Sequence, residues 1–162
     1  MSKDEPHKQL AGALGRIPSG LFILTARREQ QETGMLASWV QQCGFDPPAL
    51  TVALQRGRDI LAWLTPGAPF TLNILEDDQT DMIVHFGRGF ALGEPAFEGL
   101  DVQRPDGGAP VLSDALAYLQ CQVAGRCEAG DHEVFIARVL AGQVLQPEGH
   151  PMIHVRRNGF HY

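Results

Sequence analysis

Short apolar runs separated by glycine, proline and polar residues dominate this chain. Runs of about six residues that are bounded by such turn residues are typical of β-strands. Six runs predict strands and two shorter ones are candidates to close the sheet; in chain order they are 20–26, 35–40, 49–54, 70–75, 116–127, 133–145, 153–155 and 159–161. Strands in this number without long helices between them favour an antiparallel barrel over a doubly wound parallel sheet.

Helical patterns are few and short. Leu10 is followed at helical spacing by Ala13, Leu14 and Ile17, which places all four on one face of a helix. We expect this helix to end at Pro18. Residues 58–64 predict a second short helix. The acidic residues 76–78 suit the positive end of a third helix, which continues to about Phe86. The expected fold is therefore mostly β with short helical insertions.

The connections between these elements differ in length. Polar residues predict turns over 27–33 and at 130–132. The glycine-rich stretch 87–108 predicts a long irregular surface loop, a length that is unusual in a compact domain. Two roles stay open for this loop, a lid over a site or an arm of a dimer.

The size and charge of the chain narrow the function classes. Its 162 residues match one domain, so we expect 1–162 to form a single unit with a disordered stretch over 1–8. A net charge of −6 disfavours nucleic acid and anionic membranes as partners, because both attract clustered Lys and Arg. No apolar run approaches the roughly 20 residues of a membrane helix, and the start has no apolar signal core. We therefore expect a cytoplasmic protein.

Cysteines and histidines provide no strong chemical signal. A strand places Cys121 and Cys127 about 20 Å apart, which is too far for a disulfide, whereas Cys43 could meet either one. We expect all three thiols to be reduced. His150 and His154 have helical ligand spacing, but Pro151 lies between them, and we predict no metal site.

Common catalytic motifs are absent as well. The sequence contains no P-loop, no nucleophile elbow and no zincin helix motif. The glycines that begin at Gly87 depart from the dinucleotide fingerprint by one residue, so a Rossmann domain is not expected.

One segment, 34–50, concentrates groups that could bind a ligand. It combines a hydroxyl at Ser38, an indole at Trp39 and several amides on a strand that leads into a Pro-Pro turn. Backbone N–H groups at such a strand edge can bind a planar heterocycle that carries many acceptors. The residues alone leave a second interpretation open, in which Trp39 belongs to the core and Ser38 is an edge hydroxyl.

Six ordered pieces of the sequence resemble the flavin-reductase-like family of FMN-binding split β-barrels. The resemblance covers about Leu10 to Tyr162 and is greatest to the C-terminal flavin-reductase module of flavodiiron proteins of oxygenic phototrophs. The pieces are the segments 19–26, 34–48, 70–75, 85–86 before the glycine loop, 116–121 and 130–132.

The resemblance implies a flavin site for FMN. Residues that match the family segment along the isoalloxazine ring and ribityl chain are Met35, Leu36, Ala37, Ser38 and Trp39. Gln55, Arg56 and Gly57 match the region that holds the ribityl-phosphate end, and a guanidinium makes Arg56 the expected phosphate ligand. Asn73 and Phe86 match positions that shape the rest of the pocket.

The resemblance also implies a homodimer in which NADH or NADPH docks against the flavin. His132 matches the histidine of the family's Gly-Asp-His turn near the nicotinamide, where it would position the cofactor. The implied activity is that of an NAD(P)H:flavin oxidoreductase. Two alternatives stay open: an FMN-carrying electron-transfer flavoprotein that works with an electron-acceptor protein, and a flavin-free dimer.

Two departures from the family bear on how tightly flavin is held. Relatives often carry Ser or Thr where this chain has Gln42 and Gly44, so fewer hydroxyls are available beside the flavin segment. The sequence leaves two outcomes open: a loosely held flavin that is released after reduction, or a retained flavin that carries electrons.

Overall fold

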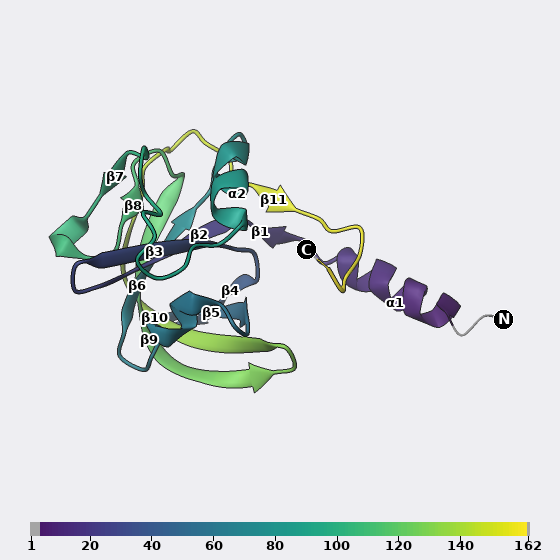
Figure 1. Cartoon of the computed structure of the whole chain (residues 1–162). Coiled ribbons are helices and arrows are strands. Elements are labelled where there is room, and N and C mark those ends of the chain that lie inside the picture. The colour runs from purple at the N-terminus through teal and green to yellow at the C-terminus, as the bar shows by residue number, and fades with distance from the viewer. Residues whose placement is uncertain (1–3, 162) are drawn as a thin grey trace.

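The computed structural model describes residues 4–161, and its centre is a seven-stranded sheet with the order β3-β2-β6-β9-β10-β5-β4 (Figure 1). Every pair of neighbouring strands is antiparallel. In chain order the strands are β2 (Phe22–Arg28), β3 (Gln31–Ala37), β4 (Val40–Phe45), β5 (Pro48–Gln55), β6 (Pro69–Ile74), β9 (Ala117–Ala129) and β10 (His132–Val144). The predicted fold class, mostly β and antiparallel, is confirmed.

Short elements occupy the connections. They are α1 (Asp4–Gly15), β1 (Ser19–Gly20), the 3-10 turn η1 (Asp59–Ala62), α2 (Thr80–Gly87), β7 (Val102–Gln103), the 3-10 turn η2 (Pro105–Gly107), β8 (Val111–Leu112) and β11 (Ile153–His154). The predicted helices at 58–64 and after 76–78 correspond to η1 and α2. Across the described residues 4–161, each helix is too short or too polar to cross a membrane.

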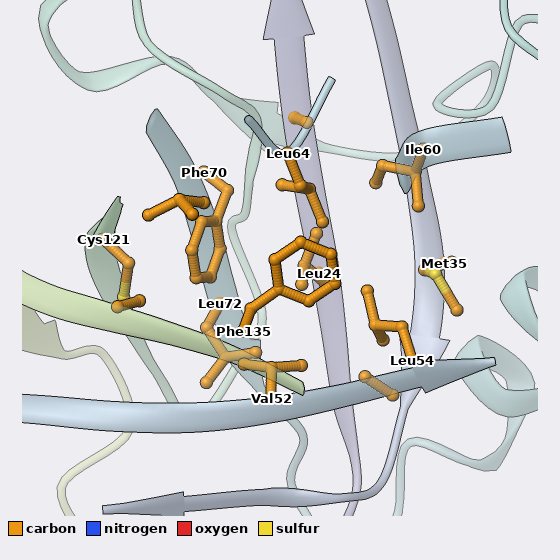
Figure 2. Close-up of a cluster of buried hydrophobic side chains, with 14 of the residues drawn as sticks. Leu24, Met35, Val52, Leu54, Ile60, Leu64, Phe70, Leu72, Cys121 and Phe135 are labelled. Atoms are coloured by element: carbon orange, nitrogen blue, oxygen red, sulfur yellow. The ribbon is translucent and has the colours of Figure 1, made fainter. Parts of the chain in front are cut away.

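The main core lies inside the curled sheet, where apolar side chains from facing strands meet (Figure 2). On β5 the residues Leu50, Val52 and Leu54 are buried and alternate with less buried neighbours. Alternation follows from the pleat, which points successive side chains to opposite faces. Leu24 of β2 and Phe135 of β10 meet them from other strands, so this core holds the sheet in its curled shape.

A second core lies on the outer face of β2, under α2. Ile23 points to this side and is fully buried with Met82 and Phe86 of α2, while its neighbour Leu24 enters the main core. Burial on both faces explains why this strand is apolar without alternation. The second core therefore fixes α2 beside β3, where the helix borders the site described below.

The sheet curls almost into a barrel but does not close. β3 and β4 lie at opposite ends of the hydrogen-bonded order, yet only Ser38 and Trp39 separate them in the chain. The short link brings the two edges together, and the amide of Ala53 donates to the carbonyl of Trp39 at 2.9 Å. The expected barrel is thus an open, split one, because no ladder joins β3 to β5 in the part of the chain described.

Several element boundaries differ from the sequence prediction. The expected turn over 27–33 is confined to two residues, since β3 already begins at Gln31 and pairs with β2. The expected strand over 35–40 is two strands, interrupted at Ser38 and Trp39. Residues 159–161 form no strand, and β11 pairs only with β1. Polarity and turn residues do not reveal such interruptions, because they depend on how the sheet curls.

Of the stretch 1–8, expected to be disordered, residues 4–8 belong to α1 (Asp4–Gly15), and residues 1–3 lie outside the described residues. Contacts with the C-terminal segment hold the helix. The amide of Gly159 donates to the carbonyl of Ala11 at 2.8 Å, and the rings of His7 and Phe160 stack at 4.6 Å. Together α1 and residues 155–161 form an arm that projects away from the sheet (Figure 1).

The stretch 87–108 is largely irregular, as predicted, and it is packed against α2. The imidazole Nε2 of His85 lies 2.8 Å from the carbonyl oxygen of Ala96. The rings of Phe90 and Phe97 each lie 5.8 Å from the ring of Phe86, which is part of the second core. These contacts hold the first half of the loop beside the open edge of β3.

All three cysteines are free thiols. Cys43 and Cys127 are exposed, while Cys121 is buried in the main core. Burial raises the pKa of the Cys121 thiol to about 12, so this residue packs as a small apolar side chain.

Candidate functional site

A pocket of about 340 Å³ lies in the gap between β3 and β5, and we call it the split pocket. Its volume is at the lower end of the range for small-molecule sites. Both sheet edges, α2 and β11 contribute to the lining, which consists of Leu21, Met35, Leu36, Ala37, Ser38, Ala53, Leu54, Gln55, Arg58, Ile83, Gly87 and His154. Most of these side chains are apolar, so the pocket suits a largely apolar ligand.

The two walls of the split pocket also present backbone. β3 pairs with β2 on one side only, and β5 pairs with β4 only as far as Val52. Within residues 4–161, the free edge of β3 and the end of β5 from Leu54 onward therefore have no strand partner facing the gap. Peptide groups at such edges are strong donors and acceptors for a heterocycle.

Ser38 supplies the most direct sign that the split pocket is a ligand site. The residue is only 6% exposed, and its Oγ has no hydrogen-bond partner. An unsatisfied buried hydroxyl costs about 1–3 kcal/mol. Because Ser38 lines the split pocket, a bound heterocycle with a polar edge atom would satisfy this hydroxyl.

A second cavity of about 350 Å³ adjoins the split pocket, and we call it the polar annex. The two cavities share Met35 and Arg58. The annex runs between η1 and the 87–108 loop and is lined by Thr33, Gly34, Met35, Gly57, Arg58, Asp59, Ile60, Arg88, Gly89, Phe90, Ala91 and Glu94. It therefore adds charged groups to one end of an otherwise apolar site.

Glycine is required at one point of the annex in particular. Gly89 has a φ of 74°, and a Cβ there would lie 3.3 Å from Nη1 of Arg58. The loop backbone thus approaches the guanidinium closely and limits where Arg58 can lie.

Two arginines compete as anion ligands at this end of the site, and the structure separates them. Arg58 is half-buried, lines both cavities, and its Nη2 lies 3.5 Å from Oε1 of Gln55. Arg56 lines neither cavity, and its Nη2 pairs with Oε2 of Glu128 at 3.0 Å. Between them lies Gly57, whose φ of 83° turns the backbone. Arg58 is therefore the better placed phosphate ligand.

His132 lies on the other side of the Ser38–Trp39 link. Its ring is 4.6 Å from the ring of Trp39, and its Nδ1 is 2.7 Å from Oδ1 of Asp131. The hydrogen bond from His132 lowers the pKa of the Asp131 carboxyl. The same hydrogen bond orients the imidazole of His132. The guanidinium of Arg156, from the arm, lies 5.0 Å from the Trp39 ring.

A further groove of about 480 Å³ runs along this side, and we call it the outer groove. It shares Ser38 and Ala53 with the split pocket, and Trp39 lies in its lining. The other lining residues are Ile17, Pro18, Ser19, Gly20, Val40, Gln41, Thr51, Val134 and Ile153. The link between β3 and β4 thus separates two neighbouring cavities.

Residues 14–161 match the family described as flavin reductase like domain. This chain belongs to that family. The resemblance predicted from the sequence is therefore confirmed, and the split pocket is the candidate flavin site.

Relatives of this domain occur within larger proteins. The chain is 42% identical over 154 residues to diflavin flavoprotein A 1 of Synechocystis sp., which covers 94% of this chain and 27% of that protein. The chain thus spans about a quarter of the length of the curated relatives that it matches.

Solved structures of flavin reductases share the fold. The NADH:FAD oxidoreductase SgcE6 of Streptomyces globisporus superimposes with a TM-score of 0.83 at 24% identity, covering 96% of this chain and 92% of that one. The styrene monooxygenase flavin reductase of Pseudomonas putida S12 gives a TM-score of 0.74 at 26% identity, covering 95% and 93%.

The structure brings part of the predicted flavin site together. Predicted residues that line the split pocket are Met35, Leu36, Ala37, Ser38 and Gln55, and Gly57 lines the annex. Trp39 lies in the outer groove. These positions fit a flavin: an apolar cavity, free strand edges and an unpartnered hydroxyl occur beside a guanidinium.

Asn73 and Phe86 line none of these cavities and lie behind the walls. Asn73 is fully buried; its Nδ2 donates to the carbonyl of Ile23 at 3.1 Å, and its Oδ1 accepts from the amide of Leu112 at 2.8 Å. Phe86 packs in the second core, where a Cβ at Gly34 would lie 2.9 Å from its ring. Both residues shape the site by holding its supports in place.

Sequence reasoning missed the lining residues that come from other elements. Ile83 and Gly87 enter from α2, His154 from β11, and Arg88 and Glu94 from the loop. Only the glycines that flank Arg88 marked this part of the sequence as unusual. The others lack any local signal, because their places depend on long-range packing. Among residues 4–161 there is no group of three His, Cys, Asp or Glu side chains that could hold a metal ion.

Proposed function

We propose that this flavin reductase-like domain is an NAD(P)H:flavin oxidoreductase that binds FMN in the split pocket. The observation that carries the proposal is the buried, unpartnered hydroxyl of Ser38 between two free strand edges, with Arg58 at one end. A bound flavin supplies the ring that accepts a hydride, which is two electrons and one proton, from reduced nicotinamide, while solvent provides the second proton.

The residues of this chain would bind and orient the two cofactors. Met35, Ala37 and Leu54 offer the flavin ring an apolar surface that is rigid because they also belong to the main core. Ser38 offers a hydrogen bond to the polar edge of the ring. Arg58, rather than the predicted Arg56, offers its guanidinium to the phosphate.

The outer groove is the proposed nicotinamide side. Ser38 and Ala53 line both this groove and the split pocket, so a ligand in one cavity lies close to a ligand in the other. Trp39 offers a stacking surface, and Asp131 orients His132 beside it. His132 acts here as a positioning residue.

A homodimer is part of the proposal, and the arm supports it. Apolar side chains on the arm and beside the outer groove are exposed to solvent, with exposed fractions of 52% at Leu10, 61% at Ile17, 70% at Ile153 and 55% at Val155. Exposed apolar residues that cluster on a projecting element are typical of a protein interface. A second copy is the proposed cover for this surface.

The test begins with the purified protein and added FMN. We expect quenching of flavin fluorescence on binding and FMN-dependent oxidation of NADH or NADPH. The absence of turnover with both nucleotides and several flavins would contradict the proposed reductase activity. Flavin that stays bound through purification, with negligible nicotinamide oxidation, would instead support an electron-transfer flavoprotein that is reduced by a partner.

A further inference from the structure

The polar annex carries balanced charges rather than a surplus of cations. Arg58 and Arg88 line it together with the carboxylates Asp59 and Glu94. Guanidinium groups bind phosphates best when no carboxylate competes for them. The carboxylates of the annex should therefore weaken its binding of a phosphate. The contacts of one of them, Glu94, indicate how it does so.

Glu94 connects the loop backbone to Arg88. Its Oε2 accepts from the amide of Ala91 at 2.9 Å and lies 3.9 Å from Nη1 of Arg88. The same guanidinium lies 4.0 Å over the ring of Phe90. The loop thus holds Arg88 against its own residues, whereas Arg58 makes no ion pair among the described side chains.

We propose that Glu94 determines how strongly this site binds phosphorylated flavin: by engaging Arg88 it weakens FMN binding, so that flavin exchanges as a substrate. The inference rests on the proposed function, because it takes the annex as the place of the flavin phosphate. The charge of Glu94 would then favour release of the flavin over its retention.

The effect of Glu94 on phosphate binding can be measured separately from binding of the flavin ring. Riboflavin has the same ring system as FMN but no phosphate, so a change confined to the annex alters FMN affinity and leaves riboflavin affinity nearly unchanged. Glu94→Gln removes the charge and keeps a side-chain oxygen for the amide of Ala91, so the loop retains its hydrogen bond. The variant then leaves Arg88 available to the phosphate.

A matched control lies on the same loop. Glu98 lines a different surface groove and not the annex, so Glu98→Gln makes the same change in net charge at a position outside the site. Dissociation constants for FMN and riboflavin, measured by flavin fluorescence at low salt, would be compared among wild type, Glu94→Gln and Glu98→Gln. We expect Glu94→Gln to bind FMN about three- to tenfold more tightly and riboflavin within about twofold of wild type. Glu98→Gln should change neither.

Arg88 provides a second measurement. In an Arg88→Gln background, adding Glu94→Gln should improve FMN binding by less than about twofold, because the residue through which Glu94 acts is gone. An undiminished gain in that background, an unchanged FMN affinity in Glu94→Gln, or an equal gain for riboflavin would overturn the inference. Failure of the wild-type protein to bind either flavin would instead contradict the proposed function itself.

Discussion

The split pocket and the polar annex adjoin each other but are built differently. The walls of the split pocket come from strands whose inner faces form the main core, such as Met35 and Leu54. The annex is bounded by a 3-10 turn and an irregular loop, and its arginines and carboxylates balance one another. Shape and apolar burial therefore decide recognition of a ring in the first cavity, whereas exposed and half-buried charges decide recognition of an anion in the second.

The largest expected effect comes from filling the split pocket. Ala53→Trp would place an indole at the boundary of the split pocket and the outer groove, and we expect affinity for FMN and riboflavin alike to fall about thirtyfold or more. Fluorescence titration measures both constants. Ala124→Trp, at an exposed position of β9, is the matched control and should bind both flavins normally. Normal binding by a folded Ala53→Trp protein would place the flavin elsewhere.

A smaller and selective effect is expected in the annex. Arg58→Ala should weaken FMN binding about ten- to a hundredfold, because a charge-assisted hydrogen bond is lost, and should change riboflavin binding little. Arg56→Ala should leave both affinities within about twofold, since Arg56 pairs with Glu128 away from the cavities. Titration of both variants with both flavins checks the assignment. The reverse pattern would restore Arg56 as the phosphate ligand.

The smallest effect is expected at Ser38, whose hydroxyl bears both on ring binding and on the stability of the fold. Ser38→Ala removes a buried hydroxyl without a partner, so the free energy of unfolding of the flavin-free protein should rise by about 1 kcal/mol. Binding of both flavins should weaken about fivefold, because the ligand loses a hydrogen bond. Urea unfolding with and without FMN measures the two changes. Loss of stability in the flavin-free variant would mean that the hydroxyl is already satisfied.

Much of the fold was accessible from local sequence. Apolar runs bounded by turn residues placed β5, β6, β9 and β10 close to their observed positions, because strands that pack in a core need apolar side chains and end where turn residues begin. The break at Ser38 and Trp39 was not accessible. The surrounding residues remain apolar there, and the interruption arises only because the chain crosses from one edge of the sheet to the other.

The candidate site, too, was predictable from the sequence only in part. The segment 35–39 was predicted as the flavin wall, and the structure places residues 35–38 in the split pocket and Trp39 in the outer groove. Asn73 and Phe86 were predicted to shape the rest of the flavin pocket, and they lie behind its walls rather than in its lining. A sequence motif marks which residues matter to a site, and it does not distinguish a residue that touches the ligand from one that holds a wall.

The sequence by itself determined the antiparallel β architecture, the family and the strand that forms one wall of the site, because these depend on short apolar runs, turn residues and short ordered motifs. Only the tertiary structure decided that the sheet stays split, that Arg58 rather than Arg56 borders the cavities, and that Glu94 reaches Arg88. These features depend on the direction of side chains at turns and on contacts between distant segments. Such contacts arise from packing of the whole chain and leave no pattern in neighbouring residues.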